Sequence, residues 1–346
     1  MPPETVAVAL SGGVDSSVAA AILKKEGYRI IGLTLWLNDD SDTPQKAEHI
    51  AKILSIPHYI IDCRDTFYQK VVTDFYSQYS LGKTPNPCVI CNRYIKFGVM
   101  LDKASELGAS LLATGHYARV AFSPEEYRLL KAADSSKDQS YFLYRLSQDI
   151  LKRILFPIGH LRKPQVLEIA NELGLTQVAK KESQDICFIP GNDYRIFITN
   201  HITLKDGDIV DSEGNLLGRH NGLPLYTIGQ RQGLGISLKK PLYVIELDTA
   251  NNRLIVGKED ELICNTLLAG NLSWLSDIAP AGLESITARI RSRSPESPAR
   301  LKLNANTAVV HFLKPQRAIT PGQSVVFYNG QAVLGGGIIK TRYRTS

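Results

Sequence analysis

Two stretches of this sequence carry side chains that could do chemistry, and the first is suited to binding phosphate. Residues 10–17 read Leu-Ser-Gly-Gly-Val-Asp-Ser-Ser, between an apolar run at 5–9 and a helix-like stretch at 18–26. A strand that turns through glycines into a helix gathers free backbone N–H groups and the positive end of the helix dipole at one point. Six small polar or glycine residues in seven positions exceed what an ordinary helix cap needs. No lysine follows the glycines, unlike in the Gly-x-x-x-x-Gly-Lys-Ser/Thr loop.

The second stretch carries thiols. Residues 84–97 read Thr-Pro-Asn-Pro-Cys-Val-Ile-Cys-Asn-Arg-Tyr-Ile-Lys-Phe, and their prolines are expected to delay a helix until about Asn92. Cys91 would then lie at a helix N-terminus, where the dipole lowers the pKa of a thiol and favours a nucleophilic thiolate. Half of a zinc site is an alternative, but no second Cys-x-x-Cys or His pair has the usual spacing. A four-iron four-sulfur cluster is another, with three irons held by Cys88, Cys91 and Cys187.

The remaining cysteines divide into one candidate for chemistry and two for packing. Cys187 follows two lysines at 180–181, whose charges would also favour a thiolate. Cys63 and Cys264 are expected to be small buried apolar residues. Five cysteines with irregular spacing suit thiol chemistry or metal binding better than a disulfide framework.

The elements that must position these residues alternate between strand and helix in the first half of the chain. Strands are predicted at residues 5–9, 28–37, 58–62 and 110–115, and helices at 18–26, 44–54, 67–81, 93–107, 138–146 and 164–173. This rhythm predicts a doubly wound parallel sheet of the α/β class, with a ligand crevice at the carboxyl ends of its strands. Residues 10–17 and 114–116 both follow such strands, so we expect them to face one another across a nucleotide.

From about residue 205 the pattern changes to short alternating runs separated by Gly, Asn and Pro. Residues 243–256 form a clear predicted hairpin around an Asp-Thr-Ala-Asn-Asn turn, and further strands are predicted at 308–313, 324–328 and 333–340. The expected domains are an α/β catalytic domain at 1–204, a small β-rich domain at 205–267 and a β-barrel at 268–346.

Charge is distributed unevenly along the chain. Residues 266–346 hold ten basic and three acidic residues, a net charge of +7, so the total of +6 leaves −1 for residues 1–265. A basic terminal module on a nearly neutral body suggests a polyanionic partner, although a solvated basic face explains the charge alone equally well. No apolar stretch is as long as a membrane span, and the strand at residue 5 leaves no room for a signal or transit peptide. The expected location is the cytoplasm, with no membrane partner.

Six motifs in one order carry a family resemblance. Residues 10–17 resemble the pyrophosphate-binding loop of the ATP pyrophosphatase (PP-loop) superfamily, whose members cleave ATP between the α- and β-phosphates and adenylate a substrate. The others are Asn-Pro-x-x-x-Cys-Asn at 86–92, Thr-Gly-His-Tyr at 114–117, Lys-Asp-Gln-Ser-Tyr-Phe-Leu at 137–143, Asp-Ile-Cys-Phe-Ile at 185–189 and Tyr-Thr-Ile-Gly-Gln-Arg-x-Gly-Leu-Gly-Ile at 226–236. Together they resemble the bacterial tRNA-specific 2-thiouridylases, the MnmA or TrmU family, from the first strand to residues 321–328.

The resemblance implies an activity and a set of site residues. It implies a sulfurtransferase that adenylates C2 of the wobble uridine (position 34) of tRNA and replaces its oxygen with sulfur through a cysteine persulfide, releasing AMP and pyrophosphate. Cys91 would be the nucleophile and Cys187 the persulfide carrier. The residues implied to contact ATP are Leu10, Ser11, Gly12, Gly13, Val14, Asp15, Ser16, Ser17, Leu35 and Gly115. Those implied to contact tRNA are Asn86, Pro87, Cys88, His116, Lys137, Asp138, Gln139, Arg291, Ser292 and Gln323.

The resemblance also implies cofactors and partners. ATP would act with Mg²⁺, for which Asp15 is a candidate ligand. The substrates would be the Lys, Glu and Gln tRNAs, and sulfur would come from a cysteine desulfurase or a sulfur-relay protein. Many members have Asp where this chain has Cys88, and the familiar pattern has Tyr at Ser292. The alternatives are an amidating PP-loop synthetase and a zinc- or cluster-containing RNA-binding protein without turnover.

Overall fold

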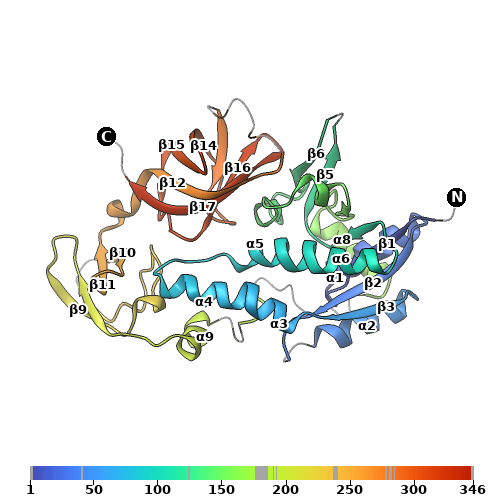
Figure 1. Ribbon diagram of the computed structural model, residues 1–346, viewed down its shortest axis with the longest axis horizontal. Helices are drawn as coiled ribbons and strands as arrows, with labels where there is room; N and C mark the ends of the chain where they lie inside the picture. The colour runs from blue at the N-terminus through green and yellow to red at the C-terminus, as the bar shows by residue number, and fades with distance from the viewer. Residues whose placement is uncertain are drawn as a thin grey trace.

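The computed structural model describes residues 3–39, 42–123, 125–175, 186–189, 191, 193–236, 241–276, 279, 283 and 285–343. An α/β body forms the N-terminal part, a small β-sheet follows, and a β-barrel forms the C-terminal part (Figure 1). The barrel lies over the long helices of the body (Figure 1). None of the helices in these ranges is long and apolar enough to cross a membrane.

The body is built on a five-stranded parallel sheet with the order β3-β2-β1-β4-β7. Its strands are β1 (Thr5–Ala9), β2 (Arg29–Trp36), β3 (His58–Asp62), β4 (Leu111–Ala113) and β7 (Ile154–Leu155). β1 and β2 are almost wholly buried, as their continuous apolar runs require when both faces of a sheet are covered. The predicted doubly wound sheet is confirmed, and β1 and β4 are the neighbours at which the strand order reverses.

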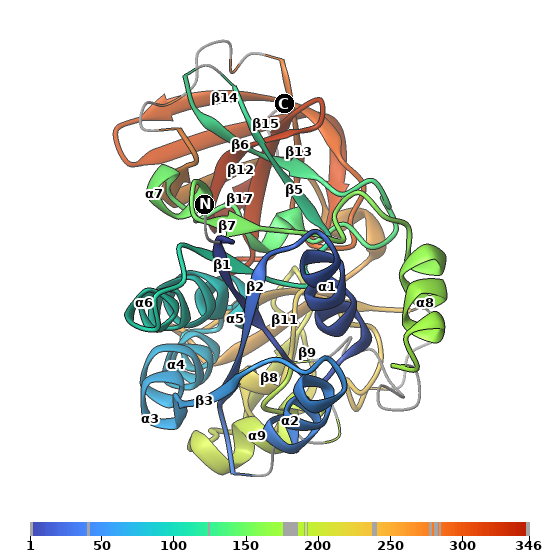
Figure 2. The same ribbon diagram turned by 90° about the vertical axis from the view of Figure 1, so that its right-hand side faces the viewer.

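Helices cover both faces of this sheet (Figure 2). One layer holds α1 (Val14–Lys25), α2 (Thr43–Ile53) and α8 (Lys163–Glu172). The other holds α3 (Arg64–Phe67), the π-helix η1 (Tyr68–Val72), α4 (Thr73–Ser80), α5 (Pro87–Cys91), the π-helix η2 (Asn92–Val99) and α6 (Met100–Glu106). The short α7 (Gln148–Leu151) and α9 (Tyr194–His201) complete the body.

Two predicted helices differ in the structure. The helix that carries the cysteines begins at Pro87 rather than near Asn92, because a proline at the first helical position has its φ angle preset and loses no hydrogen bond. The helix predicted at 138–146 is wrong. Only a 3₁₀ turn, η3 (Ser140–Phe142), forms there, and Tyr141 and Tyr144 are fully buried. The hydroxyl of Tyr141 donates to the carbonyl oxygen of Ser324 in the barrel, and the hydroxyls of Tyr144 and Ser324 share a hydrogen bond.

A hairpin that the sequence did not indicate extends from the body to the barrel. β5 (Ala118–Phe122) pairs with β6 (Tyr127–Lys131), and β6 meets β17 at the pair Leu130 and Ala332. The small sheet has the order β10-β11-β8-β9 and consists of β10 (Tyr243–Asp248), β11 (Arg253–Gly257), β8 (Gly207–Val210) and β9 (Leu216–His220). The hairpin predicted at 243–256 is therefore confirmed. The 3₁₀ turns η5 (Leu223–Leu225) and η6 (Glu259–Leu262) flank this sheet.

The C-terminal strands close into a six-stranded antiparallel barrel. They are β12 (Ile263–Trp274), β13 (Ile286–Arg289), β14 (Ser297–Asn304), β15 (Thr307–Arg317), β16 (Ser324–Asn329) and β17 (Ala332–Tyr343), and β12 pairs with both β15 and β17. In β14 every second side chain enters the barrel core, while Arg300 and Lys302 are exposed on the outside. The strands predicted in this region are confirmed.

Candidate active site

The turn between β1 and α1 has the geometry of an anion site. β1 ends at Ala9 and α1 begins at Val14, with Gly13 extended at the N-cap (φ −94°, ψ 159°). No side chain in the described part of the chain caps this helix end, so the first backbone N–H groups remain open to a ligand. The hydroxyls of Ser16 and Ser17 donate to the carbonyl oxygen of Gly13 (3.0 and 2.9 Å) and stabilise the turn itself.

The residues packed around this turn leave no room for a side chain at Gly12. Gly12 has a φ of +73°, and a Cβ there would lie 2.5 Å from Cβ of Lys46, so both conformation and space require glycine. Leu10 and Leu35 are buried beneath the turn, at the carboxyl ends of β1 and β2, while Ser11 is exposed. That these residues contact ATP remains a prediction, and such contacts would come mainly from their backbone atoms.

The two segments expected to face one another are in contact. A Cβ on Gly115 would lie 2.7 Å from both the carbonyl carbon of Asp15 and the nitrogen of Ser16. This close approach is possible because β4, which precedes Gly115, pairs with β1. The segment 114–116 thus packs directly on the start of α1, at the reversal of strand order where α/β sheets bind their ligands.

Asp15 has two partners that the sequence did not reveal. Nζ of Lys163, the first residue of α8, lies 2.8 Å from Oδ1 and 3.0 Å from Oδ2 of Asp15. The hydroxyl of Tyr117 donates to Oδ1 of Asp15 (2.8 Å), and the backbone N–H of Lys163 donates to Asp134 (3.0 Å). A lysine is therefore present beside the phosphate-binding turn after all, supplied by a helix distant in sequence.

The three candidate cysteines differ in exposure. Cys88 is exposed in the first turn of α5, whereas Cys91 is buried at the end of this short helix. Cys187 is exposed, in a turn closed by a hydrogen bond from the N–H of Ile189 to the carbonyl oxygen of Ile186 (3.0 Å). Phe188 anchors this turn, because its ring packs edge-on against three other phenylalanine rings of the body.

The thiols are protonated near neutral pH. Desolvation raises the pKa of Cys91 to about 12, and it also raises the pKa values of Cys88 and Cys187 above 9.0, although both expose part of their surface. The expectation that the helix dipole lowers the pKa of Cys91 is wrong. The helix begins at Pro87, so Cys91 is its fifth residue and lies beyond the free N–H groups of the first turn.

Lys96 is the cation that opposes this desolvation. Its charge acts to lower the pKa values of Cys88, Cys91 and Cys187. Lys96 lies in the π-helix η2, five residues after Cys91. Nothing in the sequence pattern marked Lys96 for this role. The lysines at 180–181, expected to act on Cys187, lie outside the described residues.

Metal binding depends on how the Cys, His, Asp and Glu side chains are arranged, and disulfide formation depends on how the cysteines are arranged. No group of three or more His, Cys, Asp or Glu side chains within the described ranges is arranged to hold a metal ion. All five cysteines are free thiols. Cys63 and Cys264 are buried in apolar clusters, as predicted.

His116 connects the phosphate-binding turn with the thiols. It follows Gly115 and is buried, with Nδ1 hydrogen-bonded to the hydroxyl of Thr114 (2.7 Å). Its ring lies 5.9 Å from that of Phe97, the neighbour of Lys96. Desolvation, with a smaller contribution from Lys96, holds the pKa of His116 well below 6.5, so the ring is neutral. Its predicted contact with tRNA remains a prediction.

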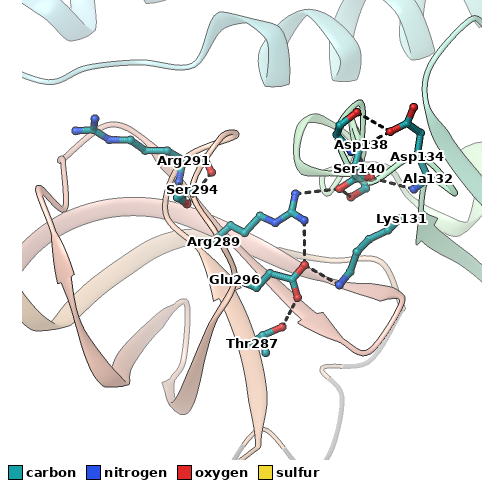
Figure 3. Close-up of polar contacts among 11 residues, drawn as sticks. Lys131, Ala132, Asp134, Asp138, Ser140, Thr287, Arg289, Arg291, Ser294 and Glu296 are labelled. Atoms are coloured by element: carbon teal, nitrogen blue, oxygen red, sulfur yellow. Dashed lines mark hydrogen bonds and ion pairs between the residues drawn. The ribbon is translucent and has the colours of Figure 1, made fainter. Parts of the chain in front are cut away.

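The predicted tRNA segment 137–139 is held in place by its own side chains. Gln139 accepts a hydrogen bond from the N–H of Tyr117 (2.9 Å). The carboxylate of Asp138 points away from solvent toward Arg289 of the barrel (Figure 3). Any contact of this segment with tRNA would therefore come from its backbone or from the side chains of Lys137 and Gln139 rather than from the Asp138 carboxylate.

The predicted barrel contacts also face inward. Nη2 of Arg291 donates to the hydroxyl of Thr320 (2.7 Å) and to the carbonyl oxygens of Ala318 (3.1 Å) and Ile228 (3.3 Å). Burial lowers the pKa of this guanidinium, which points away from Arg289 (Figure 3). A phosphate contact through Nη2 of Arg291 would have to replace these bonds. Ser292 is half-buried in the turn after β13.

The segment 84–88 is tied to the barrel by the amide side chain of Gln323. Nε2 of Gln323 donates to the carbonyl oxygens of Thr84 (2.9 Å) and Pro85 (3.2 Å). Pro87 is buried at the start of α5. The residues predicted to lie by the target base are thus fixed between the body and the barrel.

Family models match consecutive parts of the chain. The tRNA methyl transferase HUP domain matches residues 4–191, the tRNA methyl transferase PRC-barrel domain 195–258, and the aminomethyltransferase beta-barrel domain 264–339. The three together span the α/β body, the small sheet and the barrel.

Curated relatives cover nearly the whole chain. It is 47% identical over 358 residues to tRNA-specific 2-thiouridylase MnmA 1 of Caldanaerobacter subterraneus subsp. tengcongensis, covering 98% of each chain. It is 47% identical over 345 residues to MnmA of Desulforudis audaxviator (98% of this chain, 99% of the relative) and 46% identical over 344 residues to MnmA of Microcystis aeruginosa (96% and 98%). The chain therefore belongs to the MnmA family of tRNA-specific 2-thiouridylases.

Proposed function

We propose that this protein is a tRNA-uridine 2-sulfurtransferase that uses ATP to replace the C2 oxygen of wobble uridine 34 with sulfur. The observation that carries the proposal is the continuity of the site. The open helix end at Val14 touches Gly115, His116 follows at once, and the ring of His116 lies beside the helix that carries Lys96 and Cys91. A nucleotide and a sulfur-bearing thiol can therefore act on one base.

The first step is adenylation. The C2 oxygen of uridine attacks the α-phosphorus of ATP, the bond to the bridging α–β oxygen breaks, and pyrophosphate leaves with that electron pair. The oxygen becomes part of AMP, a far better leaving group than an oxide. The N–H groups at the start of α1 would hold the phosphates, and Asp15 would hold Mg²⁺ or one of its waters. Mg²⁺ supplies charge neutralisation for pyrophosphate.

The second step transfers sulfur. The terminal sulfur of a persulfide on Cys187 attacks C2, the C2–O bond breaks, and AMP leaves. Cys91 then attacks the Cys187 sulfur, which breaks the S–S bond and leaves the C2 thiocarbonyl with a Cys91–Cys187 disulfide. Alternatively, Cys91 attacks the persulfide first and the sulfide released attacks C2. Either route oxidises two thiols by two electrons, so a dithiol reductant must restore them.

The finer substrate and partner assignments follow the family. We propose the Lys, Glu and Gln tRNAs as substrates and a cysteine desulfurase or sulfur-relay protein as donor, with the cytoplasm as the compartment. An anticodon loop suits this site, since an unstacked base can enter a pocket that base-paired RNA cannot reach. The iron–sulfur alternative is not favoured, because the persulfide route needs only thiols.

The test uses iron-free protein purified in air. It is given a tRNA transcript, ATP with Mg²⁺ and sulfide, and both 2-thiouridine and AMP are measured. We expect both products in equal amounts from the unmodified protein, and no 2-thiouridine from Cys91→Ser with a persulfide donor. Thiolation that requires prior reconstitution of a cluster would overturn the persulfide route, and AMP without any thiolated base would overturn the function.

A further inference from the structure

A buried ionic cluster joins the barrel to the α/β body. Its members are Lys131, Asp138, Arg289 and Glu296, here named the junction cluster (Figure 3). Arg289 donates from Nη1 to Asp138 (2.9 Å) and from Nη2 to Glu296 (3.0 Å). Lys131 donates to the same oxygen of Glu296 (2.6 Å), and the hydroxyl of Thr287 donates to the other (2.7 Å). Arg289, Thr287 and Glu296 belong to the barrel, whereas Lys131 and Asp138 come from the body.

The junction cluster is shielded from water and balanced in charge. The side chain of Asp138 is 1% exposed, and those of Arg289, Lys131 and Glu296 are 13%, 15% and 19% exposed. Two cations face two anions, so no member is left with an uncompensated charge. Breaking such a cluster by removing one partner is far more costly than breaking an exposed pair, because the remaining charge stays buried.

Arg289 is the central member because it alone contacts both carboxylates. Its two terminal nitrogens reach Asp138 and Glu296 in the forked geometry of a guanidinium, which the single nitrogen of a lysine cannot reproduce. The guanidinium carbon also lies 5.1 Å from the ring centre of Tyr328, and Nζ of Lys131 lies 5.0 Å from the same ring. The ring and the two carboxylates together define one position for Arg289.

Asp138 also fixes the backbone on either side of it through hydrogen bonds. Its Oδ1 accepts hydrogen bonds from the N–H groups of Ala132 (3.0 Å) and Ser140 (3.3 Å), and its Oδ2 accepts one from the hydroxyl of Ser140 (2.9 Å). These bonds fix the backbone that presents Lys137 and Gln139. The same carboxylate therefore shapes the segment and attaches it to the barrel.

The barrel also contacts the segment that precedes α5, the helix that carries Cys88 and Cys91. The barrel turn that contains Pro321 and Gln323 bonds to Thr84 and Pro85, through the Gln323 amide and through a hydrogen bond from the N–H of Thr84 to the carbonyl oxygen of Pro321 (2.9 Å). Cys88 follows three residues after Pro85. A displacement of the barrel would therefore move the start of α5.

We propose that Arg289 is a positioning residue that locks the barrel to Asp138, so that segment 137–139, the barrel and the start of α5 form one preorganised surface for tRNA. This role rests on the proposed function. In this proposal the Asp138 carboxylate contacts Arg289 inside the protein and does not contact RNA. A displacement of about 1 Å between such elements is enough to cost about a hundredfold in rate, because catalysis depends on near-attack geometry.

The test compares Arg289→Met and Arg289→Lys with Arg128→Met, which removes an arginine charge from an exposed site on β6. We expect Arg289→Met to lower kcat at saturating tRNA at least tenfold, with Arg289→Lys intermediate and Arg128→Met unchanged in kcat. Because Arg289 is buried, its loss should leave the salt dependence of tRNA binding unaltered. A salt slope reduced by about one phosphate contact in Arg289→Met would show that Arg289 binds RNA itself and would overturn the proposal.

A second comparison separates positioning from loss of folding and from failure of the proposed function. Asp138→Asn combined with Arg289→Met should add little to the effect of either change alone on tRNA affinity, since both break one contact. Hydrogen exchange in the intact protein should rise at residues 84–88 and 137–140 in Arg289→Met while α1 stays protected. Unchanged exchange there would overturn the proposal even if the unmodified protein proved not to thiolate tRNA.

Discussion

Nζ of Lys163 lies 2.8 and 3.0 Å from the two carboxylate oxygens of Asp15, although 148 residues separate them in the chain. The side chains are largely shielded, so in the free protein the ammonium group neutralises the carboxylate beside the phosphate-binding turn. The Asp15 carboxylate would therefore already be oriented when ATP binds with its metal ion. The turn therefore has a cation close by, and this cation comes from α8 rather than from the turn.

Asp15→Ala should abolish formation of AMP and pyrophosphate while tRNA affinity changes by no more than a few-fold. The carboxylate lies at the start of α1, away from the barrel, and its loss also leaves Lys163 without its counter-charge. Pyrophosphate release and filter binding of tRNA measure the two effects. Asp65→Ala, at an exposed carboxylate, is the matched control. Nucleotide turnover near the unmodified rate in Asp15→Ala would contradict the assignment of the turn.

Lys96→Met should make the thiols less reactive. Desolvation already raises the pKa values of Cys88 and Cys187, and Lys96 partly opposes it, so removing its charge should raise them further. Alkylation of both thiols should therefore need a higher pH than that of an ordinary cysteine in the unmodified protein, and a still higher pH in the variant. Mass spectrometry of the alkylated peptides gives the profile, and Lys96→Arg should restore it. Identical profiles for Lys96→Met and the unmodified protein would exclude this role.

The three cysteines near Lys96 should differ in their response to substitution. Cys91→Ser and Cys187→Ser should each abolish thiolation, because each thiol performs a chemical step in the persulfide route. Cys88→Asp should retain appreciable activity in air, since the family often has Asp there. Measurement of 2-thiouridine and of bound iron distinguishes the routes. Loss of iron and activity together in Cys88→Asp would favour a cluster.

Arg300→Gln and Lys302→Gln should each weaken tRNA binding and flatten its salt dependence by about one phosphate contact. Both side chains are exposed on β14, whereas Arg289 and Arg291 are engaged inside the protein and cannot be counted toward the basic surface. Binding titrations at several salt concentrations measure the slope, with Lys25→Gln on α1 as control. Slopes equal to that of the unmodified protein would mean that this face is only solvated.

Acid should weaken the junction cluster through Glu296. Burial acts to raise the pKa of this carboxyl, but hydrogen bonds from Lys131 and Thr287, together with the charges of Lys131 and Arg289, hold the pKa below its ordinary value of 4.5. A pKa lowered on folding contributes stability above the unfolded value that is lost as pH falls through the folded value. Glu296→Gln should therefore have a lower urea midpoint than the unmodified protein at pH 7, and the difference should shrink below about pH 4.5. Fluorescence of Trp274 in a Trp36→Phe background reports the barrel, and a difference independent of pH would contradict this.

Local features of the chain determined the phosphate-binding turn and most strands and helices. An apolar run followed by glycines and a helix start needs only neighbouring residues, so the strand, turn and helix around residues 10–17 and the predicted β-hairpin and barrel strands are confirmed. The ATP contacts of residues 10–17 stay a prediction. The positive φ of Gly12 and the tight packing of Gly115 are the structural reasons for glycines that the motif already contained. The family could likewise be identified from six motifs in order.

Tertiary structure decided the directions of side chains and the partners of charges. The helix predicted at 138–146 yielded to the burial of Tyr141 and Tyr144 against the barrel, because packing outweighs the small preferences of single residues. The thiol of Cys91 has a raised pKa because desolvation by distant segments exceeds the local dipole. Sequence alone placed Asp138 and Asp15 in motifs, but only the folded chain brings Arg289 to the first and Lys163 to the second.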